Sequence, residues 1–256
     1  MRVGELFKLT YSSALGLRSL VQLLSKATDE VPFLATPSSL EVKVLSPDKT
    51  SLMILQLPAI AFEEYVCDID EFFVVATDEL MKVVRRGGRN DGVSIELNKA
   101  LRQLKLVLKN KKTGVERAFN IELKERVREA VPELSVELSV SVRILARDFK
   151  DLVKDLKIVG EEARFTYSDG KLYVKAYGYP KEYEAILEEG NPLVSISSSI
   201  SKAEAAYSIA HLEMVARASS MAEVIDLMFD TDKPLKLELA LETGGRVIYW
   251  IAPRTM

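Results

Sequence analysis

The chain has 256 residues, a formal net charge of −3 at pH 7 and a hydrophobic content of 48%. This length suffices for two domains of roughly 120 residues, each with its own core. No apolar run approaches the ~20 residues of a membrane span, and the N-terminus lacks a signal-peptide pattern, so we expect a protein of the cytoplasm or nucleus. Cys67 is the only cysteine, which excludes an internal disulfide and a zinc site built from cysteines.

The first half is predicted to contain two helices and many short strands. Ser12 and Ser13 cap the first helix, which extends to about residue 26. Thr77 or Asp78 is expected to cap the second helix, which ends at the glycine pair 87–88. Strands are expected at residues 5–10, 31–35, 40–45, 51–57, 64–67, 71–75, 93–97, 101–108 and 117–123.

Residues 124–134 break this pattern, because they are charged and carry Val131-Pro132. We predict an interdomain linker there, between an N-terminal domain at 1–123 and a C-terminal domain at 135–256. The second half has predicted helices at 148–157 and 209–218. Its strands are expected at residues 136–144, 163–167, 172–177, 182–187, 203–208, 224–229, 234–241 and 246–251.

The apolar pattern of the first half recurs 132 positions later. In the first helix of each half, the matching residues are Leu17, Leu20, Val21 and Leu24, and Phe149, Leu152, Val153 and Leu156. The segment 40–43 matches 172–175 in the same way. The recurrence indicates an internal duplication, so the expected fold class is α+β, with two helices plus antiparallel sheets in each of two domains.

Basic side chains gather opposite the apolar stripes of the predicted helices. They are Arg18 and Lys26, Lys82, Arg85 and Arg86, Lys150, Lys154 and Lys157, and Arg217. Because the protein is acidic overall, we expect the acidic residues on loops and strand ends instead. Such a separation of charge attracts a polyanion to one surface. No aromatic or amide side chains are placed among these residues to read bases, so a nucleic acid would be bound through its phosphates. An ordinary solvated helix face is the alternative interpretation.

No catalytic constellation or cofactor motif is recognisable. His211, the only histidine, has no Cys or Ser partner nearby in the sequence, which favours a structural role. The glycine-rich segment 87–92 follows a helix and lacks the nucleotide-binding spacings. We therefore expect no enzymatic activity, no cofactor and no metal ion. A metal-dependent enzyme that uses Asp68 and Asp70 is the alternative.

The tandem repeat, the linker residues 131–133 (Val-Pro-Glu) and the ending 249–254 (Tyr-Trp-Ile-Ala-Pro-Arg) together resemble the sliding clamp proliferating cell nuclear antigen (PCNA) in its archaeal form. The resemblance covers the whole chain. It implies a noncatalytic processivity factor of DNA replication and repair, associated with the nucleoid. Three subunits would form a ring with helices around a central hole for duplex DNA and sheets outside. A heterotrimer with paralogous subunits is the alternative to a homotrimer.

The resemblance also implies three sets of site residues. The DNA-facing set is Lys82, Arg85, Lys154 and Arg217, by correspondence with the family, with Arg18, Arg86 and Lys150 added from the helix-face argument. The pocket set, expected to line an apolar pocket beneath the linker, is Leu45, Lys49, Thr50, Leu52, Val131, Pro132, Pro234, Trp250, Ala252 and Pro253. The edge set joins subunits through Phe119 and Ile121 of one and Tyr183 and Ile186 of the next. The implied partners are double-stranded DNA and, through short peptide motifs, DNA polymerase, the clamp loader, flap endonuclease and DNA ligase.

Overall fold

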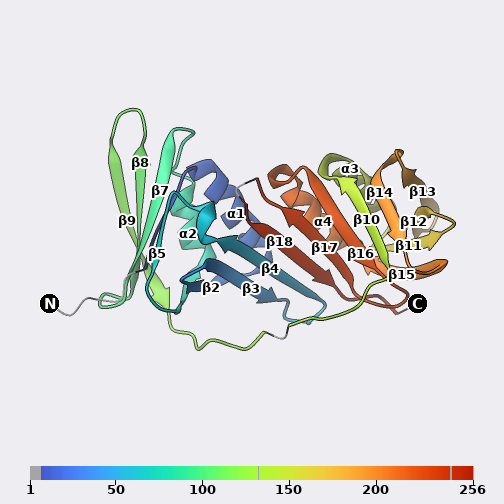
Figure 1. Ribbon diagram of the computed structural model, residues 1–256, viewed down its shortest axis with the longest axis horizontal. Coiled ribbons are helices and arrows are strands. Elements are labelled where there is room, and N and C mark those ends of the chain that lie inside the picture. Colours follow the sequence, from blue (N-terminus) through green and yellow to red (C-terminus); the bar gives the residue numbers. More distant parts are fainter. Residues whose placement is uncertain (1–6, 132, 243, 256) are drawn as a thin grey trace. The chain divides into compact units, whose positions relative to one another are not determined.

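The computed structural model describes residues 7–131, 133–242 and 244–255 (Figure 1). The chain forms two compact units. Unit 1 consists of Met1–Val44, Ile54–Val131 and Thr243–Gly245, and unit 2 of Leu45–Met53, Pro132–Glu242 and Arg246–Met256. The loop around residue 48 therefore belongs to unit 2, although it lies early in the sequence. The domain boundaries at residues 123 and 134 stay a prediction.

The two halves of the sequence run through the same order of elements. The first half contains β1 (Phe7–Tyr11), α1 (Ala14–Ala27), β2 (Glu30–Thr36), β3 (Ser39–Leu45), β4 (Ser51–Pro58), β5 (Glu64–Cys67), β6 (Glu71–Ala76), α2 (Thr77–Val84), β7 (Asp91–Asn98), β8 (Gln103–Asn110) and β9 (Glu116–Lys124). The second contains β10 (Val140–Leu145), α3 (Ala146–Val159), β11 (Glu162–Ser168), β12 (Lys171–Gly178), β13 (Lys181–Glu189), β14 (Pro192–Ser198), β15 (Lys202–Ser208), α4 (Ile209–Arg217), β16 (Val224–Phe229), β17 (Leu235–Ala240) and β18 (Arg246–Ile251). Because α1 and α3 begin 132 residues apart, as do β2 and β11, the predicted duplication is confirmed.

Strand pairing repeats between the units as well. In unit 1 the strand order is β5-β1-β7-β8-β9, and β2 lies between β3 and β6. In unit 2 the order β14-β10-β16-β17-β18 corresponds to the first of these, and β13-β12-β11-β15 to the second. These pairings are antiparallel, and the α+β prediction is confirmed.

The helices form because their apolar residues recur on one face. Ser13 caps α1 by accepting a hydrogen bond from the backbone nitrogen of Gly16 at 3.1 Å, as predicted from the sequence. In each unit the two helices pack against one another, α1 with α2 and α3 with α4. In unit 1, side chains of both helices and of the strands surround an apolar cavity of about 40 Å³; they include Leu17, Leu20, Leu80, Phe33 and Phe73.

Three local predictions are wrong. Thr77 does not cap α2 but lies inside it, and its hydroxyl donates to the backbone oxygen of Thr28 at 2.8 Å. The helix ends at Val84, with Arg85 as its C-cap, before the glycine pair is reached. Strand β10 begins at Val140 rather than at residue 136. Strand β14 was not predicted at all, because its serine-rich sequence lacks a run of apolar residues.

Within the part of the chain that the structure describes, no helix combines the length and the apolar character needed to cross a membrane.

Candidate nucleic-acid and subunit interfaces

The DNA-facing set lies on the four helices and just beyond the end of α2. Arg18 lies on α1, Lys82 on α2, Lys150 and Lys154 on α3, and Arg217 on α4, whereas Arg85 and Arg86 follow the last residue of α2. Arg18 is half-buried, and the other side chains are exposed. The apolar stripes of these helices pack inward, so their basic residues are left on the solvent side.

Several of these cations are paired with carboxylates of the same helices. Lys82 contacts Asp78 at 3.3 Å and Glu79 at 2.5 Å. Lys154 contacts Asp151 at 2.6 Å. The expectation that acidic residues would lie away from the helix faces is therefore wrong, because carboxylates three and four residues from a cation share its face. Solvent screens pairs as exposed as these, so a phosphate can compete with the carboxylates.

Glu213 on α4 holds two cations from different helices. It accepts from Lys157 of α3 at 2.7 Å and from Arg217 of α4 at 2.9 Å. The hydrogen bond from Lys157, followed by that from Arg217, lowers the pKa of Glu213. The carboxylate therefore stays ionised, and it fixes α3 and α4 to one another on the face that carries the basic residues.

The remaining members of the DNA-facing set form no ion pair with any described residue. They are Arg18, Arg85, Arg86 and Lys150. Arg85 and Arg86 are both exposed and follow one another at the end of α2, with Arg89 exposed three residues later. Positive charge in unit 1 is thus least compensated at the end of α2, where a polyanion would gain most.

The edge set lies on two strands that have one open edge each. Among the residues that the structure describes, β9 pairs only with β8 along Glu116–Glu122 and meets β6 at its last two residues. Strand β13 pairs with β12 from Lys181 to Leu187 and meets β14 only at its end. Phe119 and Tyr183 are half-buried. Ile121 faces the core with 4% exposure, whereas Ile186 is 52% exposed.

An exposed apolar cluster beside β13 was missed in the sequence analysis. Ile158 at the end of α3 and Tyr177 at the end of β12 are 64% and 57% exposed, and Tyr179 in the β12–β13 turn is fully exposed. The turn lies against the end of α3, since the Nζ of Lys181 donates to the backbone oxygen of Ile158 at 3.3 Å. The sequence could have indicated this cluster, because the short segment 177–180 carries two tyrosines, whereas turns ordinarily carry polar residues.

The structure brings part of the pocket set together within unit 2. The backbone nitrogen of Ala252 donates to the backbone oxygen of Thr50 at 2.8 Å. Leu52 and Trp250 are buried, and the Nζ of Lys236 lies 5.9 Å from the centroid of the Trp250 ring. Of the others, Leu45, Pro234 and Pro253 are half-buried and Lys49 is exposed. Val131 belongs to unit 1, and Pro132 lies outside the described residues.

The loop that carries Lys49 and Thr50 is held in shape by Asp48. Its carboxylate accepts from the hydroxyl of Ser46 at 2.6 Å, and from the hydroxyl and backbone nitrogen of Thr50 at 2.8 and 3.1 Å. These bonds, that from Ser46 first, lower the pKa of Asp48 to about 2. Lys49 adopts a left-handed backbone conformation, with φ of 58°. The loop therefore presents its backbone to Ala252 in a defined conformation at neutral pH.

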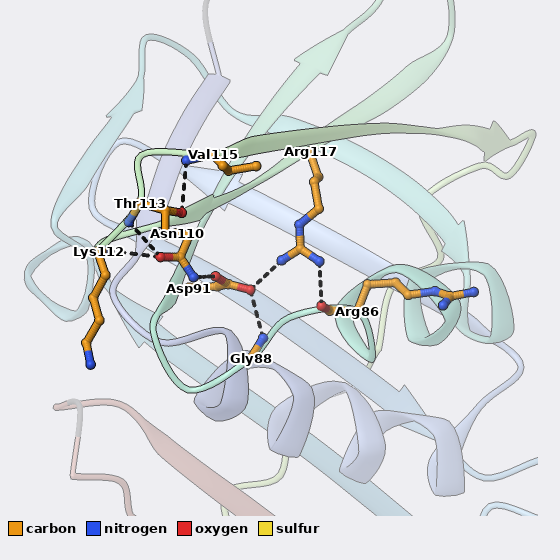
Figure 2. Close-up of polar contacts among 8 residues, drawn as sticks. All are labelled: Arg86, Gly88, Asp91, Asn110, Lys112, Thr113, Val115 and Arg117. Atoms are coloured by element: carbon orange, nitrogen blue, oxygen red, sulfur yellow. Dashed lines mark hydrogen bonds and ion pairs between the residues drawn. The ribbon is translucent and has the colours of Figure 1, made fainter.

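A buried polar cluster at the end of α2 was also missed (Figure 2). Asp91, which is 3% exposed, accepts from the backbone nitrogen of Gly88 at 2.8 Å, from Nδ2 of Asn110 at 2.9 Å and from Nη2 of Arg117 at 2.5 Å. The hydrogen bond from Gly88 is the largest cause of a lowered pKa of Asp91. The carboxylate is thus ionised at neutral pH, and it ties together the loop after α2, the end of β8 and strand β9.

Among residues 7–131, 133–242 and 244–255, no group of His, Cys, Asp and Glu side chains is arranged to hold a metal ion.

Known proteins match the chain over nearly its whole length. The family model of the N-terminal domain of PCNA matches residues 6–129. DNA polymerase sliding clamp 2 of Sulfurisphaera tokodaii is 28% identical over 249 residues, which are 97% of this chain and 100% of the relative. The DNA polymerase sliding clamp of Thermofilum pendens is 27% identical, covering 96% of this chain and 98% of the relative.

Solved structures share the fold. The crystal structure of PCNA from Thermococcus kodakaraensis superposes with a TM-score of 0.89 at 25% identity, over 97% of this chain and 100% of that one. A PCNA2–PCNA3 complex from Sulfolobus tokodaii contains the same fold, with a TM-score of 0.86 at 22% identity, over 96% of this chain and 99% of that one. Taken with the duplicated strand order and the two open edges, these matches show that the chain belongs to the PCNA family of DNA polymerase sliding clamps.

Proposed function

We propose that the protein is a noncatalytic DNA sliding clamp, a ring of three subunits that encircles duplex DNA and acts as a processivity factor for DNA polymerase. The observation that carries this proposal is the pair of open strand edges, β9 in unit 1 and β13 in unit 2. Each subunit thereby offers one edge from each unit. Pairing β9 of one subunit with β13 of the next would satisfy the backbone groups of both edges.

The apolar groups beside these strands support the same arrangement. Ile186 on β13, and Ile158 and Tyr179 near the start of that strand, expose large side chains that a second subunit would cover. Phe119 of β9 is half-buried and would be available to such a subunit. Head-to-tail contacts of this kind generate a closed ring when the rotation between subunits closes.

Contacts with DNA would be made by the DNA-facing set. Arg85, Arg86 and Lys150 are exposed and pair with no carboxylate of the described residues, whereas Lys82, Lys154 and Arg217 would exchange a carboxylate for a phosphate. Such contacts carry no sequence information, which suits a ring that must move along any template. The ring raises the effective concentration of its partners, because a polymerase held on it rebinds as an intramolecular event.

Partner enzymes would dock through short peptide motifs at the pocket set. Thr50, Ala252 and Pro253 support this proposal, since a backbone hydrogen bond joins the two segments that carry them and their side chains are half-buried. DNA polymerase, the clamp loader, flap endonuclease and DNA ligase are the proposed partners. A clamp works where the chromosome is, so the proposed location is the cytoplasm at the nucleoid.

A specific observation favours a heterotrimer as a second candidate. The relative from Sulfurisphaera tokodaii is designated clamp 2, and the complex from Sulfolobus tokodaii contains PCNA2 and PCNA3. The chain would then be one of three different subunits, each with its own partner preference.

Light scattering after size exclusion, over a concentration series, tests the ring. A mass near three times 28.6 kDa supports the homotrimer. A monomer or dimer that reaches the trimer mass only with paralogous subunits from the same genome supports the heterotrimer. The ring should then remain on nicked circular duplex, leave when the circle is linearised, and stimulate DNA polymerase on primed circles. Equal retention on linear and circular DNA would contradict encirclement.

A further inference from the structure

Arg117 links the end of α2 to strand β9 by two contacts of one guanidinium group (Figure 2). Its Nη2 donates to the buried carboxylate of Asp91 at 2.5 Å, and its Nη1 donates to the backbone oxygen of Arg86 at 3.0 Å. Arg86 follows the C-cap of α2, where helix carbonyls lack donors within the helix. The guanidinium is a rigid planar fork, so a movement at one contact changes the geometry of the other.

The two segments joined by Arg117 have different proposed tasks. The end of α2 carries Arg85 and Arg86, two of the four cations of the DNA-facing set that form no ion pair with a described residue. Strand β9 carries Phe119 and Ile121 of the edge set, and its open edge begins beside Arg117. Since Asp91 is buried and also holds Gly88 and Asn110, the linkage has a fixed base.

We propose that Arg117 is a positioning residue that couples phosphate binding at the end of α2 to subunit pairing at β9. Duplex DNA inside the ring thereby slows dissociation of the subunits, and subunit pairing in turn strengthens the hold on DNA, as linkage requires. This inference rests on the proposed function. It adds that the two surfaces act together through one side chain, rather than independently.

The chain offers a matched control on the same pair of strands. Lys109 of β8 and Glu116 of β9 form an ion pair at 2.9 Å, with side chains 62% and 55% exposed. Both residues lie on strands, next to Arg117 in the ladder, where Leu108 is the residue opposite Arg117. Removing this pair takes away a cross-strand contact of β9 and leaves the contact of Arg117 with α2 in place.

Subunit exchange between two dye-labelled populations of full-length rings tests the coupling. The exchange rate is measured by energy transfer, free and on nicked circular duplex. Because coupling between sites typically changes affinity about 5- to 150-fold, DNA should slow exchange of the unmutated ring by at least about fivefold. Arg117→Lys keeps the charge but cannot make both contacts, so DNA should slow its exchange by less than about twofold. Lys109→Gln should retain the full slowing.

For each variant, the ratio of the subunit-exchange rate without DNA to the rate on DNA measures the coupling. A merely structural role of Arg117 would change both rates by the same factor and leave this ratio unchanged. The coupling is overturned if DNA slows subunit exchange of Arg117→Lys as much as that of the unmutated ring, or if Lys109→Gln loses as much of the slowing as Arg117→Lys. Either result leaves the proposed function standing. An unmutated chain that forms no ring or is not retained on circular DNA contradicts the proposed function, and the inference falls with it.

If Arg117→Lys unfolds at the assay temperature, hydrogen exchange on the unmutated ring decides. DNA should then slow amide hydrogen exchange in both segments, residues 86–91 and residues 117–122. Slowing in the first segment alone overturns the coupling.

Discussion

Gly87 and Ala14 approach so closely that a Cβ atom placed on Gly87 would lie 2.4 Å from the Cβ of Ala14. Ala14 is the first residue of α1, and Gly87 follows the end of α2. The glycine thus lets the end of one helix reach the start of the other, in addition to any effect on helix termination.

Replacing Gly87 with alanine should therefore destabilise unit 1 by about 1–3 kcal/mol, because the added methyl group overpacks the contact. Urea unfolding followed by circular dichroism measures the change. Gly88→Ala is the matched control, since its new Cβ would find its nearest neighbour, Oδ2 of Asp91, at 3.7 Å. Equal loss of stability in both variants would show that backbone entropy, and not the contact with Ala14, is responsible.

The sequence predicted the elements that carry an apolar period. Residues such as Leu20 and Leu152 recur at helical spacing in both halves, so both long helices and the duplication could be recognised. Strand β14 was missed, because its apolar–polar alternation covers only Val194 to Ser197 and lies in a serine-rich segment. Its place in the sheet is set by pairing with β10, which is a tertiary property.

Polar contacts between distant residues were beyond the reach of sequence patterns. Asn110 and Arg117 lie 19 and 26 residues from Asp91, and neither spacing marks them as partners. Thr77 or Asp78 was predicted to cap the second helix, but Ala76 occupies the N-cap position, and the hydroxyl of Thr77 instead donates to a backbone oxygen 49 residues away. The candidate basic face was predictable because helical spacing alone determines it, whereas the carboxylates that share it were underestimated.

Removing the hydroxyl of Tyr249 should leave stability unchanged or raise it slightly. The side chain is buried in unit 2, and its hydroxyl has no hydrogen-bond partner among the described residues. Burying the hydroxyl therefore costs free energy of desolvation that no hydrogen bond offsets. Burial also raises the pKa of Tyr249. Thermal unfolding of Tyr249→Phe measures the effect.

The control for this substitution is Tyr207→Phe in the same unit. The hydroxyl of Tyr207 donates to the backbone oxygen of Lys233 at 2.9 Å, and its removal leaves that carbonyl short of a donor. We expect a loss of about 1 kcal/mol for Tyr207→Phe. A loss of the same size in Tyr249→Phe would reveal a partner for the Tyr249 hydroxyl.

Asp91 should make the stability of unit 1 sensitive to acid. Its folded-state pKa is lowered from the ordinary value of 3.8, first by the Gly88 N–H and then, against the effect of burial, by Asn110 and Arg117. A carboxylate with a depressed folded pKa stabilises the fold fully above its unfolded value and loses that contribution as pH falls through the folded value. Asp91→Asn should therefore be less stable than the unmutated chain at pH 7, with a difference that shrinks below pH 3.8.

Chemical unfolding of both proteins between pH 7 and pH 3 measures this difference. Asp70→Asn, at an exposed position, controls for the general change in net charge. A difference between Asp91→Asn and the unmutated chain that stays constant down to pH 3 would show that the ionised form of Asp91 is not what stabilises the cluster.

The salt dependence of DNA binding should identify the contacts at the end of α2. Arg85→Ala combined with Arg86→Ala should reduce the slope of log affinity against log salt concentration by about 2 for a short duplex, about 1 for each phosphate that is no longer bound.

Lys105→Ala combined with Lys109→Ala removes the same charge from β8. These two side chains are exposed, whereas Leu104 and Leu106 of that strand are buried, so they lie on the face of the strand away from the core. The control should keep the slope of the unmutated ring if phosphates are bound on the helix side alone. Equal reductions in both double variants would mean that DNA responds to net charge only, and the assignment of Arg85 and Arg86 to the inner face would have to be abandoned.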